Sequence, residues 1–179
     1  FSLDTNSFTG TLPTELGQMT SLENFFVDLN RFTGTLPTEL ALLTALQILT
    51  VSNNSLTGTL PTELGQVTFL QYADFSDNDF TGTLPTELVH LSELTTLDVS
   101  ANALMGTLPT ELSQLGNLTQ FAFNDNDFTG SANDILCFDS RQWDILEGDC
   151  LVDETGQVKI ECNCCTFCCI RNDSMPGCI

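Results

Sequence analysis

The eight cysteines are the residues best suited to chemistry, and all of them lie after residue 136. Closely spaced thiolates are soft ligands, so a metal site is one interpretation. The other is a set of four disulfides, which an even number of cysteines in an oxidising compartment favours. We expect the disulfides, closing the last turn of the preceding structure, to use Cys137, Cys150, Cys162, Cys164, Cys165, Cys168, Cys169 and Cys178.

Outside the cysteines, the sequence offers little that catalysis could use. The single histidine, His90, lacks an evident nucleophile, because the thiols are expected to be oxidised. The chain contains no glycine-rich phosphate loop, no pair of metal-binding histidines and no EF-hand spacing. Paired carboxylates fall on columns that we expect to be exposed, with no reason for shifted pKa values. We therefore predict no enzyme, no resident metal and no cofactor, with Ca²⁺ bridging between carboxylates as the open alternative.

The charge of the chain excludes two classes of partner. There are 24 Asp and Glu against 4 Lys and Arg, which gives a formal net charge of −20. Nucleic acids bind through clustered Lys and Arg, and anionic membrane surfaces attract basic segments, so neither partner is expected. The chain also lacks an apolar run of the roughly 18 residues that a membrane helix needs, so we expect no direct membrane insertion.

A repeat of 24 residues organises the first three quarters of the chain. Glycine recurs at this spacing over 10–130, asparagine over 6–126 and proline over 13–109, and the hexapeptide Thr-Leu-Pro-Thr-Glu-Leu occurs five times unchanged. A period of this length is typical of leucine-rich repeats. We therefore place a solenoid domain of about 5.5 repeats at residues 1–130 and a cysteine-rich C-terminal cap at 131–179.

Each repeated position has a physical role. The alternation of leucines with period two predicts a short strand, and stacked copies would form a parallel sheet on the concave face. The asparagine amide can turn inward and pair with backbone groups of neighbouring turns. Glycine permits an unusual backbone angle, and proline fixes φ where the chain leaves for the convex side, where 16–19 and 40–43 suit 3₁₀ turns. The fold class predicted is an α/β-type solenoid, a right-handed superhelix.

These residues resemble the plant-type leucine-rich repeat, Leu-x-x-Leu-x-Leu-x-x-Asn-x-Leu-x-Gly-x-Ile-Pro, with Leu in place of the usual Ile before proline. In the second copy the pattern is carried by Leu22, Phe25, Val27, Asn30, Phe32, Gly34, Leu36 and Pro37. The family is found in receptor ectodomains and secreted inhibitors, and the resemblance implies a second small sheet at the Gly-x-Leu-Pro segment. The wording Thr-Gly-Thr-Leu-Pro-Thr-Glu-Leu and the tail look most like secreted or cell-surface proteins of microalgae, where such a tail closes the repeat array.

Strand residues that alternate with the core leucines are expected to point from the concave face into solvent. Phe26, Ile48 and Tyr72 would form a diagonal apolar patch, with Asp74 and Asp98 stacked beside it. Exposed apolar patches with polar rims often mark binding sites, although three exposed side chains are also within ordinary surface composition. We predict a ligand site made of Phe26, Ile48, Thr50, Tyr72, Asp74, Ser76, Asp98 and Ser100.

Threonines and glutamates also recur in columns. A flat threonine array could match a regular lattice such as ice, although threonine also suits turns and strand edges and is copied with the repeat. The glutamate column, on the convex side, is expected to be a solvated acidic face. The threonine columns are Thr11, 35, 59, 83 and 107; Thr14, 38, 62, 86 and 110; and Thr9, 33, 57, 81 and 129, and the glutamates are Glu15, 39, 63, 87 and 111.

Two further features concern processing and the tail. The sequons at Asn53, Asn117 and Asn172 are glycosylation candidates in a secreted protein. In the tail, 134–150 suits a short helix and 151–160 a hairpin. Because the first copy begins at its fourth position without a cap, we expect further chain upstream of Phe1.

These features predict an extracellular recognition or adhesion module, secreted or at the cell surface, that binds a protein or carbohydrate through its concave face. The first alternative is an inhibitor of a secreted hydrolase, since some plant-type repeat proteins have that role. The second is binding to ice or another lattice by the threonine columns.

Overall fold

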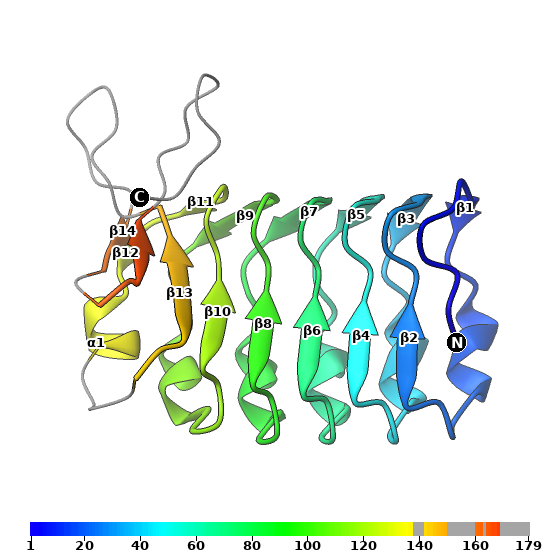
Figure 1. Ribbon diagram of the computed structural model, residues 1–179, viewed down its shortest axis with the longest axis horizontal. Coiled ribbons are helices and arrows are strands. Elements are labelled where there is room, and N and C mark those ends of the chain that lie inside the picture. Colours follow the sequence, from blue (N-terminus) through cyan, green and yellow to red (C-terminus); the bar gives the residue numbers. More distant parts are fainter. Residues whose placement is uncertain (138–141, 150–159, 163, 169–179) are drawn as a thin grey trace.

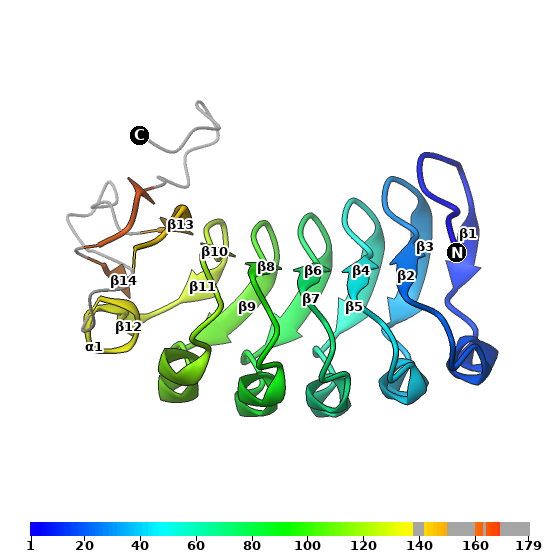
Figure 2. The same ribbon diagram turned by 60° about the horizontal axis from the view of Figure 1, so that its bottom comes forward.

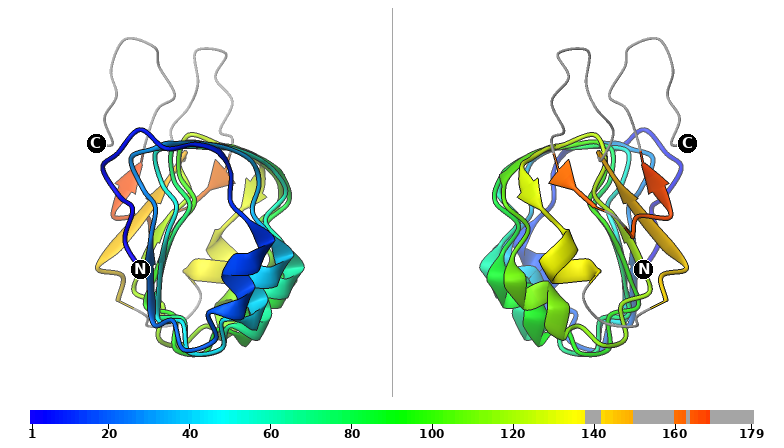
Figure 3. Two further views of the ribbon diagram at one scale, coloured as in Figure 1. Left: turned by 90° about the vertical axis from the view of Figure 1, so that its right-hand side faces the viewer. Right: turned by 90° about the vertical axis from the view of Figure 1, so that its left-hand side faces the viewer.

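Each repeat forms one turn of a solenoid, with a strand on the concave face, a second strand after the repeated asparagine, and a 3₁₀ helix (Figure 1). The computed structural model describes residues 1–137, 142–149, 160–162 and 164–168. Viewed along the stack, successive turns superpose as one ring, with the concave strands and the 3₁₀ helices on opposite sides (Figure 3). The predicted solenoid architecture is confirmed.

The concave sheet has seven parallel strands in the order β15-β13-β10-β8-β6-β4-β2. Each repeat strand is three residues long, and its central residue is buried in the core. This alternation is the period-two pattern that the leucines predict. The strands are β2 (Asn24–Phe26), β4 (Ile48–Thr50), β6 (Tyr72–Asp74), β8 (Thr96–Asp98), β10 (Gln120–Ala122), β13 (Ile145–Gly148) and β15 (Phe167–Cys168).

A second parallel sheet of six strands lies beside the first, as the family resemblance implies. It forms at the Thr-Gly-Thr segment, a few residues before each proline, and Figure 2 shows its strands as a row of their own. The strands are β1 (Thr9–Thr11), β3 (Arg31–Thr35), β5 (Ser55–Gly58), β7 (Asp79–Gly82), β9 (Ala103–Gly106) and β11 (Asp127–Phe128).

Five 3₁₀ helices follow the prolines, and each begins two residues before the turn that the sequence predicts. The proline is the extended residue that precedes each helix, so its fixed φ sets the direction in which the chain leaves the second sheet. The helices are η1 (Thr14–Gln18), η2 (Thr38–Leu42), η3 (Thr62–Gln66), η4 (Thr86–His90) and η5 (Thr110–Gln114).

The asparagine ladder, one residue per turn from Asn6 to Asn126, joins the turns to one another. Asn102 illustrates it: its Nδ2 lies 3.0 Å from the carbonyl oxygen of Phe75 in the preceding turn, and its Oδ1 accepts the N–H of Phe80 at 3.0 Å. The same Nδ2 also reaches the carbonyl of Val99, at 3.2 Å. Asn102 is 6 % exposed, so these bonds satisfy backbone groups that water does not reach.

A left-handed residue precedes every ladder asparagine. Leu29, for example, has φ 54°, and Ala101 has φ 51°. Asparagine and aspartate tolerate this conformation, and they occupy three of the six positions, Asn53, Asp77 and Asp125. Leucine and alanine rarely adopt it, so at Leu29 and Ala101 the bend is imposed by the surrounding turn. The glycine column has a different reason: Gly34 has φ +78°, and a Cβ there would lie 2.8 Å from Cγ2 of Thr11 in the turn before.

The cap continues the concave sheet. β13 pairs with β10 in parallel, with Phe121 opposite Leu146. Its inward residue Gly148 leaves room for the ring of Phe123, because a Cβ would come within 2.3 Å of that ring. The sheet therefore extends past residue 130 into the segment that the sequence assigns to the cap.

Asp149 ends one ladder of hydrogen bonds between turns, the one at the bend that contains the repeated asparagine. In each internal turn, two backbone N–H groups donate to carbonyls of the following turn, as Asn102 N–H donates to the carbonyl of Asp125. In the last turn, the N–H groups of Asp125 and Asn126 donate instead to Oδ1 and Oδ2 of Asp149, at 3.0 and 3.2 Å. A single carboxylate thus replaces two carbonyls of a further turn.

Two disulfides, Cys137–Cys164 and Cys162–Cys165, close the described part of the tail. The predicted short helix is α1 (Asn133–Leu136), and β12 (Gly130–Ser131) pairs with β14 (Ile160–Glu161). The partners expected for Cys150, Cys168, Cys169 and Cys178, and the hairpin expected over 151–160 apart from its last residue, lie outside what the structure describes. Within the described ranges, none of the helices is long and apolar enough to cross a bilayer.

Candidate functional site

The outward side chains of the concave sheet form two rows that run across the strands. The tyrosine row contains, in register, Asn24, Ile48, Tyr72, Thr96, Gln120 and Ile145. The acidic row contains Phe26, Thr50, Asp74, Asp98, Ala122 and Glu147. No described part of the chain lies in front of this face (Figure 1).

The structure brings the predicted apolar patch together on adjacent strands. Ile48 lies between Asn24 and Tyr72 in the tyrosine row, and Phe26 lies one strand away from Ile48 in the other row. Tyr72 is 37 % exposed, whereas Phe26 and Ile48 are partly buried. Tyr72 is therefore the most exposed side chain of this apolar patch.

The predicted exposure of Thr50 and Ser76 is wrong. Thr50 is 8 % exposed and Ser76 is 7 % exposed. The Thr50 hydroxyl donates to Oδ1 of Asp28 at 2.8 Å, and the Ser76 hydroxyl donates to Oδ1 of Asp74 at 2.6 Å. Both hydroxyls orient carboxylates, so they are poorly placed to contact a ligand themselves.

Asp98 is held in a fixed orientation in the same way. Oδ1 of Asp98 accepts the hydroxyl of Ser100 at 2.6 Å and its backbone N–H at 2.9 Å. Among the described residues, no donor reaches the other oxygen, Oδ2, and that atom is not buried. Ser100 therefore acts as a positioning residue, and Asp98 offers one carboxylate oxygen to a ligand.

One concave carboxylate, Asp98, does have a reason for a shifted pKa, contrary to the sequence expectation. Burial raises the pKa of Asp98, the two bonds from Ser100 lower it, and the charges of Asp74 and Glu147 raise it further. Burial also raises the pKa of Tyr72, and the carboxylates of Asp74 and Asp98 add to that rise. Both shifts therefore arise first from burial and are increased by neighbouring carboxylates.

A hollow of about 220 Å³ opens where the two rows cross β8, β10 and β13. Tyr72 and Ile145 lie at its two ends, and Asp98 and Glu147 flank it along the acidic row. Sequence reasoning missed Ile145 and Glu147. The available signal was Trp143, Leu146 and Gly148, which repeat the core positions 118, 121 and 123 at a spacing of 25 instead of 24.

The threonine columns lie on the second sheet and beside the 3₁₀ helices. Hydroxyls of two columns are engaged, as when Thr33 donates to the carbonyl of Gly10 at 3.3 Å and Thr38 to Oε2 of Glu39 at 3.4 Å. The remaining column is exposed, and its hydroxyls have no partner among the described residues: Thr11, Thr35, Thr59, Thr83 and Thr107. A hollow of about 340 Å³ between Thr35 and Thr59 interrupts the surface.

The sequence leaves two kinds of metal site open, a thiolate cluster of cysteines and a column of carboxylates. Sulfur atoms of Cys137, Cys162 and Cys164 lie within 4.8 Å of one another, which would suit a thiolate cluster. All three sulfurs are in disulfides, so this geometry does not provide free thiolates. In the glutamate column, Thr38 donates to Oε2 of Glu39 at 3.4 Å, and four of the five side chains are partly buried rather than fully solvated. Within the described ranges, no three carboxylates lie close enough together to hold a metal ion.

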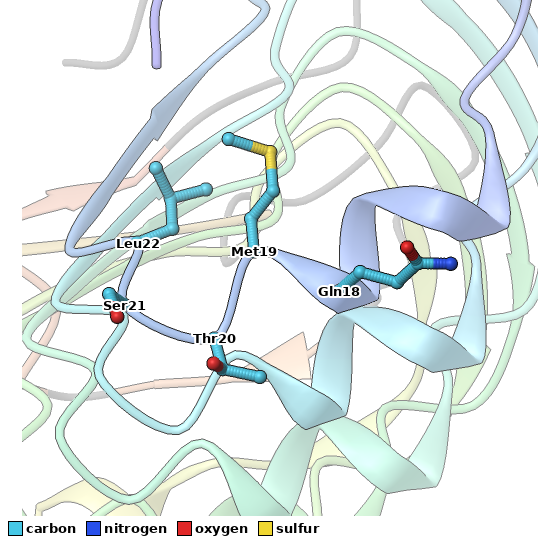
Figure 4. A pocket seen from close by; sticks show the side chains of 5 residues that line it. All are labelled: Gln18, Met19, Thr20, Ser21 and Leu22. Atoms are coloured by element: carbon cyan, nitrogen blue, oxygen red, sulfur yellow. The ribbon is translucent and has the colours of Figure 1, made fainter.

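Two other features carry little chemistry. A hollow of about 380 Å³ at the first turn is lined by uncharged residues, where Met19 and Leu22 extend to one side of the backbone and Gln18 extends away from them (Figure 4). Of the sequons, Asn53 is exposed, whereas Nδ2 of Asn117 donates to the carbonyl of Ser92 at 2.8 Å. Asn172 lies outside the described residues.

Comparisons with known proteins agree with this architecture. The leucine-rich-repeat family matches residues 45–67, 69–91 and 93–115. The chain is 33 % identical to the plant peptide hormone receptor RGFR1 solved in complex with RGF2, over 73 % of this chain and 21 % of that one, with a TM-score of 0.72. It is 31 % identical to the ectodomain of the Arabidopsis thaliana receptor kinase GASSHO1/SCHENGEN3 in complex with CASPARIAN STRIP INTEGRITY FACTOR 2, over 83 % and 18 %, with a TM-score of 0.76.

A plant ice-binding protein shares the fold at 24 % identity, over 83 % of this chain and 47 % of that one, with a TM-score of 0.74. No curated protein sequence matches the chain significantly. The chain spans about a fifth of the length of the two receptors.

Proposed function

Because this chain is a leucine-rich-repeat protein of the plant type, we propose that it is a recognition module that binds an extended protein or peptide segment across its concave sheet. One observation carries this proposal: the concave sheet is packed on one face, and on the other face, which no described residue covers, its two rows change residue type from turn to turn. Solenoids use such extended surfaces for binding.

The two rows suit a peptide better than a compact ligand. An extended chain laid across the strands would meet a new strand about every 4.8 Å, and each strand presents one side chain from each row. Phe26, Ile48 and Tyr72 lie on β2, β4 and β6, and Asp74 and Asp98 lie on β6 and β8. The receptors to which the chain is similar were solved with a peptide hormone and with an integrity factor, which supports this class of ligand.

The location and the lack of catalysis belong to the same proposal. Two disulfides in the described tail are typical of proteins in oxidising compartments, so we place the module outside the cell. His90 is exposed on η4, far along the chain from the disulfide-bonded cysteines, and we assign it no catalytic role. Inhibition of a secreted hydrolase would be one form of such recognition, and an inhibition panel of cell-wall hydrolases tests it.

A displayed library of random octapeptides tests the proposal directly. We expect selected peptides to lose binding to Phe26→Ala and Tyr72→Ala. They should retain binding to Phe69→Ala, because Phe69 is 61 % exposed but lies outside both sheets. Peptides that bind all three variants equally would place the contact surface elsewhere, and an array of glycans run in parallel tests the carbohydrate alternative.

A second candidate, binding to ice or another regular lattice, is supported by the exposed threonine column from Thr11 to Thr107, whose members end a strand of the second sheet or directly follow one. Its members recur once per turn and run diagonally across the strands, because Thr11 lies opposite Thr33 rather than Thr35, and Thr35 opposite Thr57 rather than Thr59. If this function holds, thermal hysteresis should be measurable and should fall in Thr59→Leu but not in Thr44→Leu, since Thr44 is exposed outside both sheets. Zero hysteresis removes this candidate.

A further inference from the structure

We propose that the hollow above Ala122 is a pocket for one basic side chain, arginine or lysine, of the bound segment. This inference rests on the proposed peptide recognition and adds the chemistry of the ligand. It arises from the part of the concave face that lies across β8, β10 and β13, at the end of the sheet opposite to Phe26.

The register of the acidic row creates the gap. Ala122 lies directly between Asp98 on β8 and Glu147 on β13. Its methyl group is the smallest side chain in the row, so the row dips there while a carboxylate stands on each side. Because adjacent strands are about 4.8 Å apart, the backbones that carry the two acids are separated by roughly twice that distance. A cationic head group fits between them.

The second row provides walls for the stem of such a side chain. Tyr72 and Ile145 close the two ends of the hollow with aromatic and aliphatic surface, and Thr96 and Gln120 lie between them. Arginine and lysine have apolar stems that pack along such surfaces while their charged ends reach polar groups. The Tyr72 ring can also accept a cation on its face. A hollow of about 220 Å³ accommodates one side chain rather than a folded domain.

The acidic partner in the pocket is already oriented. Both bonds from Ser100 go to Oδ1 of Asp98, so Oδ2 is left accessible and fixed in direction. The one arginine within residues 1–137, Arg31, lies on β3 of the second sheet and does not face this row. A cation from the ligand would therefore meet a carboxylate that is held ready and is not paired with a cation among the described residues.

Electrostatic complementarity selects the occupant. Burial and the neighbouring charges of Asp74 and Glu147 disfavour the ionised form of Asp98, and a bound cation would reverse that cost. An acidic side chain would be repelled by the same groups. A neutral one would leave the carboxylate without a counter-charge, so the pocket discriminates by charge.

The test uses synthetic octapeptides from the library selection, remade with Arg, Lys, citrulline or Glu at each position, at about 0.15 M salt so that long-range attraction is screened. Citrulline keeps the shape of arginine without its charge. We expect one position at which Arg or Lys binds about tenfold more tightly than citrulline, and Glu abolishes binding.

Two variants of the pocket and two controls locate that preference. Asp98→Asn removes the charge and Ala122→Leu fills the gap, and each should reduce the preference for Arg over citrulline to near unity. Asp79→Asn, an exposed aspartate on the second sheet, and Ala45→Leu, outside both sheets, should leave it unchanged. Circular dichroism verifies that each variant is folded, and either pocket variant alone suffices as the test.

The outcomes separate the two proposals. Peptides that need Phe26 and Tyr72 but show no basic preference, or keep that preference in both pocket variants, overturn the pocket and leave the recognition function standing. Peptides that bind independently of Phe26 and Tyr72, or no binding at all, overturn both.

Discussion

The two sheets of this solenoid arise from the same repeat, yet they differ in how much the repeat changes along them. On the second sheet, Thr-Gly-Thr recurs almost unaltered, and one glycine per turn adopts a positive φ. On the concave sheet, the outward positions run from Phe26 through Asp74 and Asp98 to Ala122. Residues that the backbone requires are copied in every turn, whereas the varied concave rows meet no such requirement and are free to specify a ligand.

This difference separates the two candidate functions. A lattice would need the regular surface, whose threonines recur once per turn, and a peptide would need the varied one. If the difference holds, substitutions in the copied columns lower the stability of the fold, and substitutions in the concave rows change binding.

The largest effect is expected at the asparagine ladder. Asn102→Ala removes an acceptor for the Phe80 N–H and a donor shared by the carbonyls of Phe75 and Val99, all in a position that is 6 % exposed. Each buried group left without a partner costs about 1 to 3 kcal/mol, so we expect a loss of at least about 3 kcal/mol. Chemical denaturation measures it, with Gln114→Ala on the exposed helix face as the control. A loss below about 1 kcal/mol would contradict the bridging role.

The next effect concerns the end of the stack. Asp149→Ala leaves the N–H groups of Asp125 and Asn126 without their carboxylate acceptor, and we expect the free energy of unfolding to fall by about 2 kcal/mol. The control is Asp144→Ala, which removes an equal charge from an exposed position five residues away. Equal losses in the two variants would mean that only charge matters.

The cap also marks where sequence reasoning stops. The solenoid was predictable because glycine, asparagine and proline each meet a backbone requirement that no other residue meets as well. β13 was not, since Gly148 occupies a core position that the ring of Phe123 fills from the turn before, and the spacing there changes by one residue. A search for large apolar residues at core positions misses this strand, because its core position is a glycine and the ring of Phe123 from the preceding turn fills the space.

The same limit applies within the site. Tyr72 and Asp98 were predicted because strand alternation places them outward. The burial of Thr50 and Ser76 depends on hydrogen bonds to Asp28 and Asp74, one from an adjacent turn and one from the same strand end. These hydrogen bonds depend on the three-dimensional distance between side chains, within one turn and between adjacent turns. The repeat pattern of the sequence does not give that distance.

A smaller effect, of opposite sign, is expected at the bend between the sheets. Leu29 has φ 54° and is 49 % exposed, so its side chain contributes strain and little packing. Leu29→Gly should stabilise the protein by about 0.5 to 1 kcal/mol, because relief of a left-handed conformation exceeds the added entropy of the unfolded chain. Leu42→Gly, at a similarly exposed leucine inside η2, should destabilise it instead. Two losses of stability would show that Leu29 packs better than its exposure indicates.

The smallest effect is a dependence on pH at Asp98, where stability and binding should move in opposite directions. Burial raises the pKa of this carboxyl in the folded protein above its ordinary value of 3.8, so the folded state holds the proton to higher pH than the unfolded chain does. The contribution of protonated Asp98 to stability is therefore full below 3.8 and is lost as pH rises through the raised pKa.

Binding of an arginine peptide needs the ionised carboxylate, so affinity should rise through the same window. Asp98→Asn should flatten both pH profiles relative to the unmodified chain, whereas Asp79→Asn on the second sheet should preserve them. Titration calorimetry and thermal unfolding from pH 3.5 to 7 measure the two profiles. If stability and affinity rise together with pH, ionised Asp98 stabilises the fold, as the asparagine ladder does. The distinction between copied columns that support the fold and varied rows that bind a ligand would then fail at Asp98, the residue on which the pocket depends.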